Sequence, residues 1–275
     1  MKIKKEISKI TPYLVLTIIS FLFLLPILWL FLTSLKQPVD ISKGLFIFES
    51  GVKWDNYAMA WNTSKFNISF FNTLLVGIGT VIISIVFGTP MAYSLARYSL
   101  KGNQFLSGLL LLVRMLPELL FLLPLYTIYR QTGLFDTRIG LILSFQILTL
   151  PYSVWLQRSF ILSVPRDIEE AAKIDGCSDF QILRKIVLPL IAPGTVATSI
   201  LSFITVWTSL LFPLTLAYSE AQTVSISIAN FKGYGSFNWP VMAAACIIVT
   251  VPQIIVLIFI NKYMVSGLTM GAVKG

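Results

Sequence analysis

The feature that most constrains the fold of this chain is a series of six long apolar stretches, each long enough to cross a lipid bilayer. A membrane-spanning helix needs about 20 apolar residues. Backbone polar groups in lipid must find partners within the segment, so each stretch is expected to be helical. Membrane β-strands would instead alternate in hydrophobicity over about ten residues, and these stretches do not. The predicted spans are residues 11–35, 67–96, 104–129, 139–158, 191–218 and 240–261.

The composition agrees with a membrane protein. Hydrophobic residues make up 56% of the chain and charged residues 12%, whereas soluble domains carry about 25% charge. The basic start Met1–Lys9 and the apolar run after it resemble a signal peptide, but no small-residue cleavage site closes the run. We therefore expect an uncleaved first span, and a single transmembrane domain over residues 1–275.

The distribution of basic residues predicts the orientation. Most of the 21 Lys and Arg residues fall in segments that are cytoplasmic if the N-terminus is inside, as the positive-inside rule requires. An even number of spans then places both termini, and the charged segment 163–190, in the cytoplasm. Anionic lipid accounts for the net charge of +9, so no nucleic-acid partner is expected.

Several kinds of chemistry are not expected of this chain. It has no histidine and no Gly-x-x-x-x-Gly-Lys-[Ser/Thr] loop, so if ATP is used, another chain binds it. Cys177 and Cys246 lie in positions that do not favour a disulfide. An intramembrane enzyme would need a catalytic cluster at membrane depth, and apart from Arg158 at the end of the fourth span the only charged residues in the spans are Arg114 and Glu118. A channel would need a repeated filter or ring of charge, which the sequence does not show.

The charged segment 163–190 begins with signals for a short helix. Pro165 is expected to end the preceding helix. Asp167 and Glu170 have the spacing of a capping box, which predicts a helix over 168–175. Gly176 suits the left-handed position after its end.

A second short helix is predicted directly after this turn. Ser178 and Gln181 form another capping box, so a helix is expected from 179 to about 188, with Pro189 marking the entry to the fifth span. The segment is either a solvated loop between spans or a surface for a soluble partner. Two reciprocal caps around a glycine favour the partner surface.

Two motifs then identify a family. Glu170-Ala171-Ala172, with Gly176 and Ile186-x-Leu188-Pro189 at matching spacing, resembles the EAA loop of ABC-importer permeases. The tail from Gly267 to Gly275 resembles that of the carbohydrate branch, which includes the smaller permease subunit of the maltose transporter. Asp175-Gly176 and Trp239-Pro240 also fit this branch, whereas Met270 stands where small residues are common.

The resemblance implies an all-α polytopic membrane protein with six transmembrane helices of the type I ABC importer permease kind and a short cytoplasmic coupling-helix loop. It implies a non-enzymatic permease subunit in a bacterial inner membrane, forming half of the pathway for a sugar. Oligosaccharides are the favoured substrate class, with glycerol-3-phosphate or another modified saccharide as the alternative. The implied partners are a second, homologous permease subunit, two ATP-binding subunits that hold ATP and Mg, and an extracytoplasmic sugar-binding protein.

The resemblance also implies roles for individual residues. Those expected to couple to the ATPase are Asp167, Glu169, Glu170, Ala171, Ala172, Asp175, Gly176, Ile186, Leu188 and Pro189. Gly267, Gly271, Lys274 and Gly275 are expected to form a second ATPase contact in the C-terminal tail. By position alone, Asn230, Tyr234 and Asn238 resemble a segment that contacts the binding protein.

Candidate pathway residues lie within the spans. Arg114 and Glu118 are four residues apart, so on one helix they share a face and can pair. They are either a neutralised pair that fixes helix packing or part of a gate or substrate site. Gln146, Tyr152, Trp155 and Trp207 could stack on and hydrogen-bond a sugar ring, or could serve as interfacial anchors and helix contacts.

Overall fold

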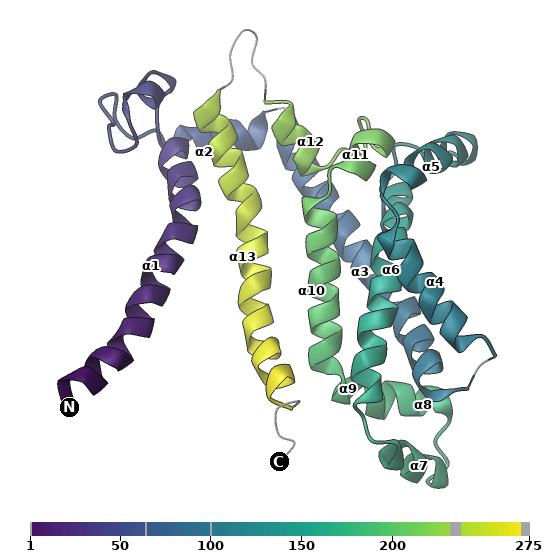
Figure 1. Ribbon diagram of the computed structural model, residues 1–275. Helices are drawn as coiled ribbons and strands as arrows, with labels where there is room; N and C mark the ends of the chain where they lie inside the picture. The colour runs from purple at the N-terminus through teal and green to yellow at the C-terminus, as the bar shows by residue number, and fades with distance from the viewer. Residues whose placement is uncertain (1, 64, 100, 232–237, 271–275) are drawn as a thin grey trace. The chain divides into compact units, whose positions relative to one another are not determined.

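The computed structural model describes residues 2–63, 65–99, 101–231 and 238–270, with side chains described between residues 12 and 258. Within these ranges the regular elements are all helices, as Figure 1 shows. The prediction of an all-α protein is therefore confirmed. In chain order the elements are α1 (Lys2–Ser34), the 3-10 helix η1 (Pro38–Lys43), α2 (Asp55–Asn62), α3 (Phe66–Arg97), α4 (Asn103–Met115), α5 (Leu119–Thr132), α6 (Arg138–Leu162), α7 (Arg166–Ile174), α8 (Asp179–Ile182), the π-helix η2 (Leu183–Val187), α9 (Leu188–Leu190), α10 (Ala192–Thr208), α11 (Leu211–Leu216), α12 (Val224–Ala229) and α13 (Trp239–Met270).

Four helical segments are long and apolar enough to cross a membrane unbroken: Pro12–Ser34, Phe66–Arg97, Arg138–Leu162 and Trp239–Ile258. Two further candidates are bent helix pairs. α4 and α5 meet at 93°, and the segment Asp179–Leu190 meets α10 at 81°. Within the described residues there are therefore up to six candidate spans if each bent pair counts as one.

The predicted continuous helix over 104–129 is wrong, because the chain breaks between α4 and α5. Leu116 adopts extended backbone angles, φ −70° and ψ 138°. It precedes Pro117, and the proline ring disfavours helical angles at the residue before it. The helix expected over 191–218 also ends early, because Ser209 is extended (ψ 141°) between α10 and α11.

The chain divides into two compact units. The first comprises residues 1–66 and 228–251, and the second residues 67–227 and 252–275. In the first unit, the segment after α1 is held by buried polar side chains. Asn56 donates hydrogen bonds of 2.8 Å to the carbonyl oxygens of Ser34 and Lys36, and the buried Asp40 carboxylate accepts the Ser50 N–H at 3.0 Å.

In the second unit, α3 and α6 pack closely and share a line of buried polar contacts. An added Cβ at Gly88 would come within 2.9 Å of the Ser153 hydroxyl oxygen, so α3 needs glycine at this close approach. Ser84 donates to Gln146 Oε1 at 2.9 Å and Thr89 to Gln157 Oε1 at 2.6 Å. These contacts satisfy polar groups in the apolar interior and fix the register of the two helices.

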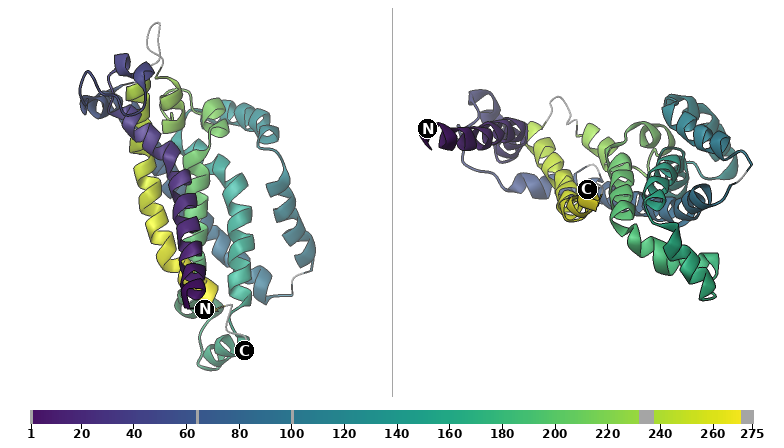
Figure 2. Two further views of the ribbon diagram at one scale, coloured as in Figure 1. Left: turned by 60° about the vertical axis from the view of Figure 1, so that its left-hand side comes forward. Right: turned by 60° about the horizontal axis from the view of Figure 1, so that its bottom comes forward.

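Two buried apolar clusters lie in this second unit. The first contains residues from the C-terminal part of α3, from α6, α7, α8 and η2, so these elements form one packed group. Figure 1 shows α7 and α8 beyond the end of α6, and both views in Figure 2 keep these two helices outside the bundle of long helices of this unit. The second cluster includes residues of α3, α5, α6, α10 and α11.

The segment that follows α11 is held by one acidic side chain. Asp136 has a left-handed backbone (φ 57°), and its carboxylate accepts the backbone N–H groups of Ser219, Glu220 and Ala221 at 3.0–3.2 Å. Asn72 donates to the carbonyl oxygens of Glu220 and Gln222 at 2.9 and 3.0 Å. These contacts help to hold α11 in place, and α11 forms one wall of the cavity described below.

Candidate functional site

The first candidate site is the pair of short helices α7 and α8. α7 begins directly after Pro165, whose ψ of 134° makes it the N-cap, and no side chain caps this end. The predicted capping box of Asp167 and Glu170 is therefore wrong. The helix begins two residues too early for Asp167 to be its N-cap, so Asp167 lies inside the first turn.

The turn between the two helices forms as predicted. Gly176 has φ 84°. Its N–H donates to the Lys173 carbonyl oxygen, and that of Cys177 to the Ala172 carbonyl oxygen, both at 3.0 Å. This is the Schellman pattern that ends a helix on a left-handed residue.

The second capping box is confirmed. Gln181 N–H donates to Ser178 Oγ at 3.4 Å, and Ser178 N–H donates to Gln181 Oε1 at 2.9 Å. The helix then runs from Asp179 to Leu190 through α8, the π-helical η2 and α9, close to the predicted 179–188. Because Pro189 has no N–H to donate, the pattern of backbone hydrogen bonds in the helix must change near it. A π-helical turn is a common form of such a change.

A buried acidic side chain fixes α7 to α3. Glu169 and Arg97 form an ion pair with an Nη2–Oε1 distance of 2.6 Å, and their side chains are 7% and 8% exposed. Arg97 Nε also donates to Glu169 Oε1 at 2.7 Å, and the Tyr93 hydroxyl donates to Oε2 at 2.8 Å. The buried carboxylate is thus satisfied by charge and by hydrogen bonds.

The same arginine reaches the end of α6. Arg97 Nη2 donates to the carbonyl oxygens of Ile161 and Val164 at 2.8 and 2.9 Å. One guanidinium therefore joins α3, α6 and α7. Sequence reasoning missed Arg97 and Tyr93, since their partner Glu169 lies more than 70 residues further along the chain.

The opposite face of these helices is exposed. Glu170 and Ala171 are exposed, and Ile174 and Phe180 are apolar side chains with 88% and 67% of their surface accessible. Ala172, also predicted to couple to the ATPase, is instead only 7% exposed and packs in the first apolar cluster. The free surface is therefore smaller than the sequence indicated, because Glu169 and Ala172 face inward together.

The remaining predicted coupling residues lie around this face. Asp167, Asp175 and Pro189 are exposed, whereas Ile186 and Leu188 are partly buried. Ile186 packs against the first apolar cluster.

An exposed polar contact also ties α8 to its neighbours. The Tyr98 hydroxyl donates to Asp179 Oδ2 at 2.6 Å, and Lys173 Nζ lies 3.0 Å from Oδ1. The hydrogen bond from Tyr98, followed by the one from Lys173, lowers the pKa of Asp179 below its ordinary value of 3.8.

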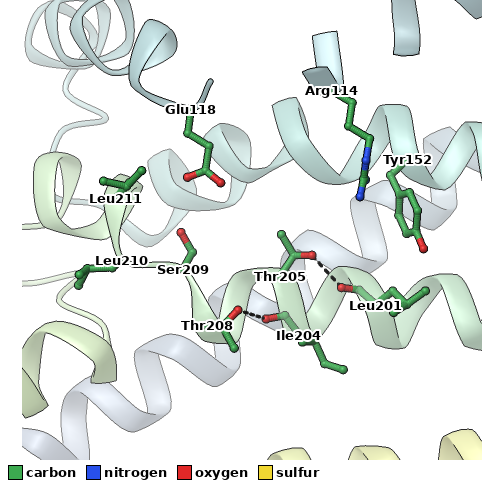
Figure 3. A pocket seen from close by; sticks show the side chains of 10 residues that line it. All are labelled: Arg114, Glu118, Tyr152, Leu201, Ile204, Thr205, Thr208, Ser209, Leu210 and Leu211. Carbon is green, nitrogen blue, oxygen red and sulfur yellow. Dashed lines mark hydrogen bonds between the residues drawn. The ribbon is translucent and has the colours of Figure 1, made fainter. Parts of the chain in front are cut away.

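The second candidate site is a cavity of about 460 Å³ in the second unit, shown in Figure 3. The Arg114 guanidinium lies over the Tyr152 ring, 4.1 Å from its centroid. Glu118 lies beyond the helix break and is the N-cap residue of α5. The ten lining residues are Arg114, Glu118, Tyr152, Leu201, Ile204, Thr205, Thr208, Ser209, Leu210 and Leu211.

The prediction that Arg114 and Glu118 share a helical face, which would let them pair, is wrong. Because the helix breaks at Leu116, the two residues lie on different helices and do not share a helical face. Among the residues whose side chains are described, no ion pair joins them.

Of the other pathway candidates, only Tyr152 lines the cavity. Gln146 binds α3 by accepting from Ser84 and donating to the Thr80 carbonyl oxygen at 3.2 Å. Trp207 is 2% exposed and packs against Phe70 and Phe203, with ring centroids 5.7 and 5.2 Å apart. Trp155 is 45% exposed and lies outside this cavity.

The residues expected to contact a binding protein or the ATPase through the tail are only partly described. Asn230 is exposed, and Asn238 accepts the N–H of Met242 on its carbonyl oxygen at 3.0 Å, at the start of α13. Gly267 lies in the last turns of α13. Tyr234, Gly271, Lys274 and Gly275 fall outside the described residues.

Within the described part of the chain, no group of three or more Cys, Asp or Glu side chains could hold a metal ion. Cys177 and Cys246 are free thiols.

Comparison with known proteins gives consistent matches. Residues 84–269 match the family described as "Binding-protein-dependent transport system inner membrane component". The trehalose transport system permease protein SugB of Mycobacterium tuberculosis is 39% identical over 255 residues, which cover 92% of this chain and 93% of that protein. The sulfoquinovosyl glycerol transport system permease protein SmoH of Agrobacterium fabrum is 34% identical over 254 residues, covering 92% and 89%.

A solved structure shows the same fold. The crystal structure of a bacterial ABC transporter involved in the import of the acidic polysaccharide alginate contains a chain that matches with a TM-score of 0.79 at 22% identity. The match covers 94% of this chain and 97% of that one.

Proposed function

Because this chain belongs to the family of binding-protein-dependent transport system inner membrane components, we propose that it forms half of the translocation pathway of an ATP-driven sugar importer. Family membership confirms the resemblance read from the EAA loop. In this proposal a second, homologous permease subunit supplies the other half, and an extracytoplasmic binding protein delivers the sugar. Two separate ATP-binding subunits bind ATP and Mg, and this chain has no catalytic site of its own.

The anchored helix α7 is the observation that carries the proposal. A solvated loop has no need of a buried ion pair, yet Glu169 joins α7 to Arg97 at 2.6 Å with little exposure of either side chain. The face turned away from the bundle presents Ile174 and Phe180, both more than half exposed. Exposed apolar side chains gathered on one surface are typical of a protein interface.

The geometry supports a mechanical role for this anchor. Arg97 contacts both α7 and the end of α6. A force applied to α7 by a partner is therefore passed through one rigid, hydrogen-bonded group to two long helices. When two ATPase subunits close, they would move α7 and with it α3 and α6, which changes access to the pathway between the permease subunits.

The orientation follows from this role. Since ATP is cytoplasmic, α7 and α8 are proposed to lie in the cytoplasm, with both termini on the same side. The C-terminal residues Gly267, Gly271, Lys274 and Gly275 remain predicted as a second ATPase contact, and Asn230, Tyr234 and Asn238 as a contact for the binding protein.

The substrate class rests on the relatives. A 39% identical relative is named for trehalose and a 34% identical one for sulfoquinovosyl glycerol. We therefore propose a saccharide as the substrate of this chain. The second relative keeps a modified saccharide as the alternative.

The test is to purify the complex from cells that co-express this chain with its ATPase and partner permease. Ile174→Asp and Glu170→Lys should each reduce recovery of the ATPase subunit at least tenfold, since each places an unfavourable charge on the exposed face of the coupling segment. Tyr218→Asp is the matched control, because Tyr218 is an equally exposed aromatic side chain (84%) next to α11, outside α7 and α8. Equal recovery of the ATPase with all three variants would contradict the proposed role of α7.

A further inference from the structure

We propose that the cavity between α4, α5, α6 and α10 is a binding site for a neutral saccharide, and that this subunit contacts the transported sugar directly. The inference rests on the proposed function and adds the place where the saccharide binds and its lack of net charge. It excludes an anionic compound such as glycerol-3-phosphate as the ligand of this site.

The cavity lies where two helices are interrupted. α4 ends at Met115 and α5 begins at Leu119, and α10 ends at Thr208 just before the extended Ser209. Arg114, Glu118 and Ser209, which flank these breaks, all line the cavity. Irregular backbone in a membrane protein is tolerated where it lines a polar or water-filled cavity, and discontinuous helices commonly form transporter substrate sites.

The two charged groups of the cavity are not paired with each other. The guanidinium of Arg114 is stacked on Tyr152, and its edge N–H groups make no hydrogen bond to any described residue. Glu118 lies across the helix break, and Figure 3 shows its carboxylate pointing toward Ser209. Isolated charges inside a membrane protein usually mark a pathway or a ligand site.

The balance of these charges selects the ligand. The lining holds one cation and one anion, so a ligand with a net negative charge would gain from Arg114 but be repelled by Glu118. A sugar hydroxyl is both donor and acceptor. One hydroxyl can accept from the guanidinium while another donates to the carboxylate, which satisfies both charges without adding a third.

The hydroxyl groups of the lining fit the same ligand. Thr205 and Thr208 donate to the carbonyl oxygens of Leu201 and Ile204 at 2.9 and 2.8 Å, so their oxygens are left as acceptors. The buried Ser209 Oγ has no hydrogen-bond partner among the described residues. The volume of about 460 Å³ lies within the 300–1,000 Å³ typical of small-ligand sites.

The experiment measures labelling of a cysteine placed in the cavity. Thr208→Cys, at an exposed position of the cavity lining, is introduced into a chain whose own cysteines are replaced by serine, and the assembled transporter is labelled with a small, membrane-impermeant thiol reagent. Trehalose and maltotriose are the neutral probes, and glycerol-3-phosphate is the anionic probe. We expect at least fivefold slower labelling with a neutral saccharide and no change with glycerol-3-phosphate. Slowing by glycerol-3-phosphate would overturn the neutral class, and no slowing by any probe would overturn the site.

A second arm uses arginine variants in the same complex. Arg114→Met should remove the protection by the saccharide, whereas Arg130→Met should not. Arg130 is the matched control because it also stacks on a ring, that of Phe135, with 5.4 Å from Cζ to the centroid, and does not line this cavity. The ATPase activity of the complex is measured in the same samples. If the complex has coupled ATPase activity but saccharide does not slow the labelling, this inference alone is refuted. If the chain recruits no ATPase subunit, the proposed function is refuted.

Discussion

Replacing Glu169 by alanine removes the acidic half of the ion pair that holds α7 to α3. The carboxylate accepts from Tyr93 Oη at 2.8 Å and from Arg97 Nε at 2.7 Å, and its distance to Arg97 Nη2 is 2.6 Å. The substitution leaves a buried guanidinium without its counter-charge. Such a loss typically costs about 3–5 kcal/mol.

The structure favours the lower end of this range. Arg97 keeps its two hydrogen bonds to the carbonyl oxygens of Ile161 and Val164, so part of its polar surface remains satisfied. We therefore expect local opening of α7 to become easier by about 3 kcal/mol. At about 1.4 kcal/mol for each factor of ten, the opening equilibrium should rise roughly 100-fold.

Hydrogen exchange of the backbone amides of α7 measures this equilibrium in the purified complex. Lys173→Ala is the control, because its ion pair with Asp179 has 52% and 50% exposed side chains. Exposed ion pairs contribute little to stability because solvent screens them, so exchange should rise far less than in the Glu169 variant. Replacing both Glu169 and Arg97 by methionine should restore slow exchange, because a buried pair can be exchanged for apolar packing at little cost. If the Glu169 and Lys173 variants exchange equally fast, the anchor has no special role.

Two further predictions concern the turn between α7 and α8. Gly176→Ala should destabilise the turn by about 1–2 kcal/mol, because its φ of 84° is unfavourable for a residue with a Cβ. An added Cβ would meet no atom within 4 Å, so the backbone angle alone causes the effect. Gly108→Ala is the control: its surroundings are equally open but its helix angles are ordinary, so it should not lower the thermal midpoint of unfolding. Because the pKa of Asp179 is lowered in the folded state, the contacts to Tyr98 and Lys173 should persist above pH 4 and be lost only as the pH falls through that lowered pKa. Exchange of the α8 amides, corrected for the intrinsic pH dependence, should show this loss in the parent chain and not in Asp179→Asn.

The sequence predicted the helices well but not where they break. Apolar runs identify spans because lipid leaves few other options. Prolines alone do not identify a break: α3 continues through Pro90 and α6 through Pro151, whereas the chain breaks at Leu116, before Pro117. Neighbouring helices can satisfy the groups that a proline frees, and that compensation depends on tertiary packing.

In the coupling segment, too, the features that depend on neighbouring residues were predicted and those that depend on tertiary packing were not. The Ser178–Gln181 box and the Gly176 turn depend on residues close in sequence, and both formed as predicted. The role of Glu169 depends on Arg97, a long-range partner that no local pattern reveals. For that reason the sequence assigned Glu169 and Glu170 alike to the ATPase contact, although only Glu170 is exposed.

The central claim is that α7 moves together with α6 and α3 when the ATPase acts on it. The most direct test is a distance measurement between spin labels at Ile174→Cys on α7 and Ser159→Cys on α6, both exposed positions, in a chain without its native cysteines. If α7 and α6 move as one body, the two labels should show one narrow distance that is the same in the nucleotide-free and ATP-bound transporter, and a broad distribution when Glu169→Ala is added. A distance that changes with ATP in the chain that keeps Glu169 would show that α7 moves independently of α6, and would contradict the account.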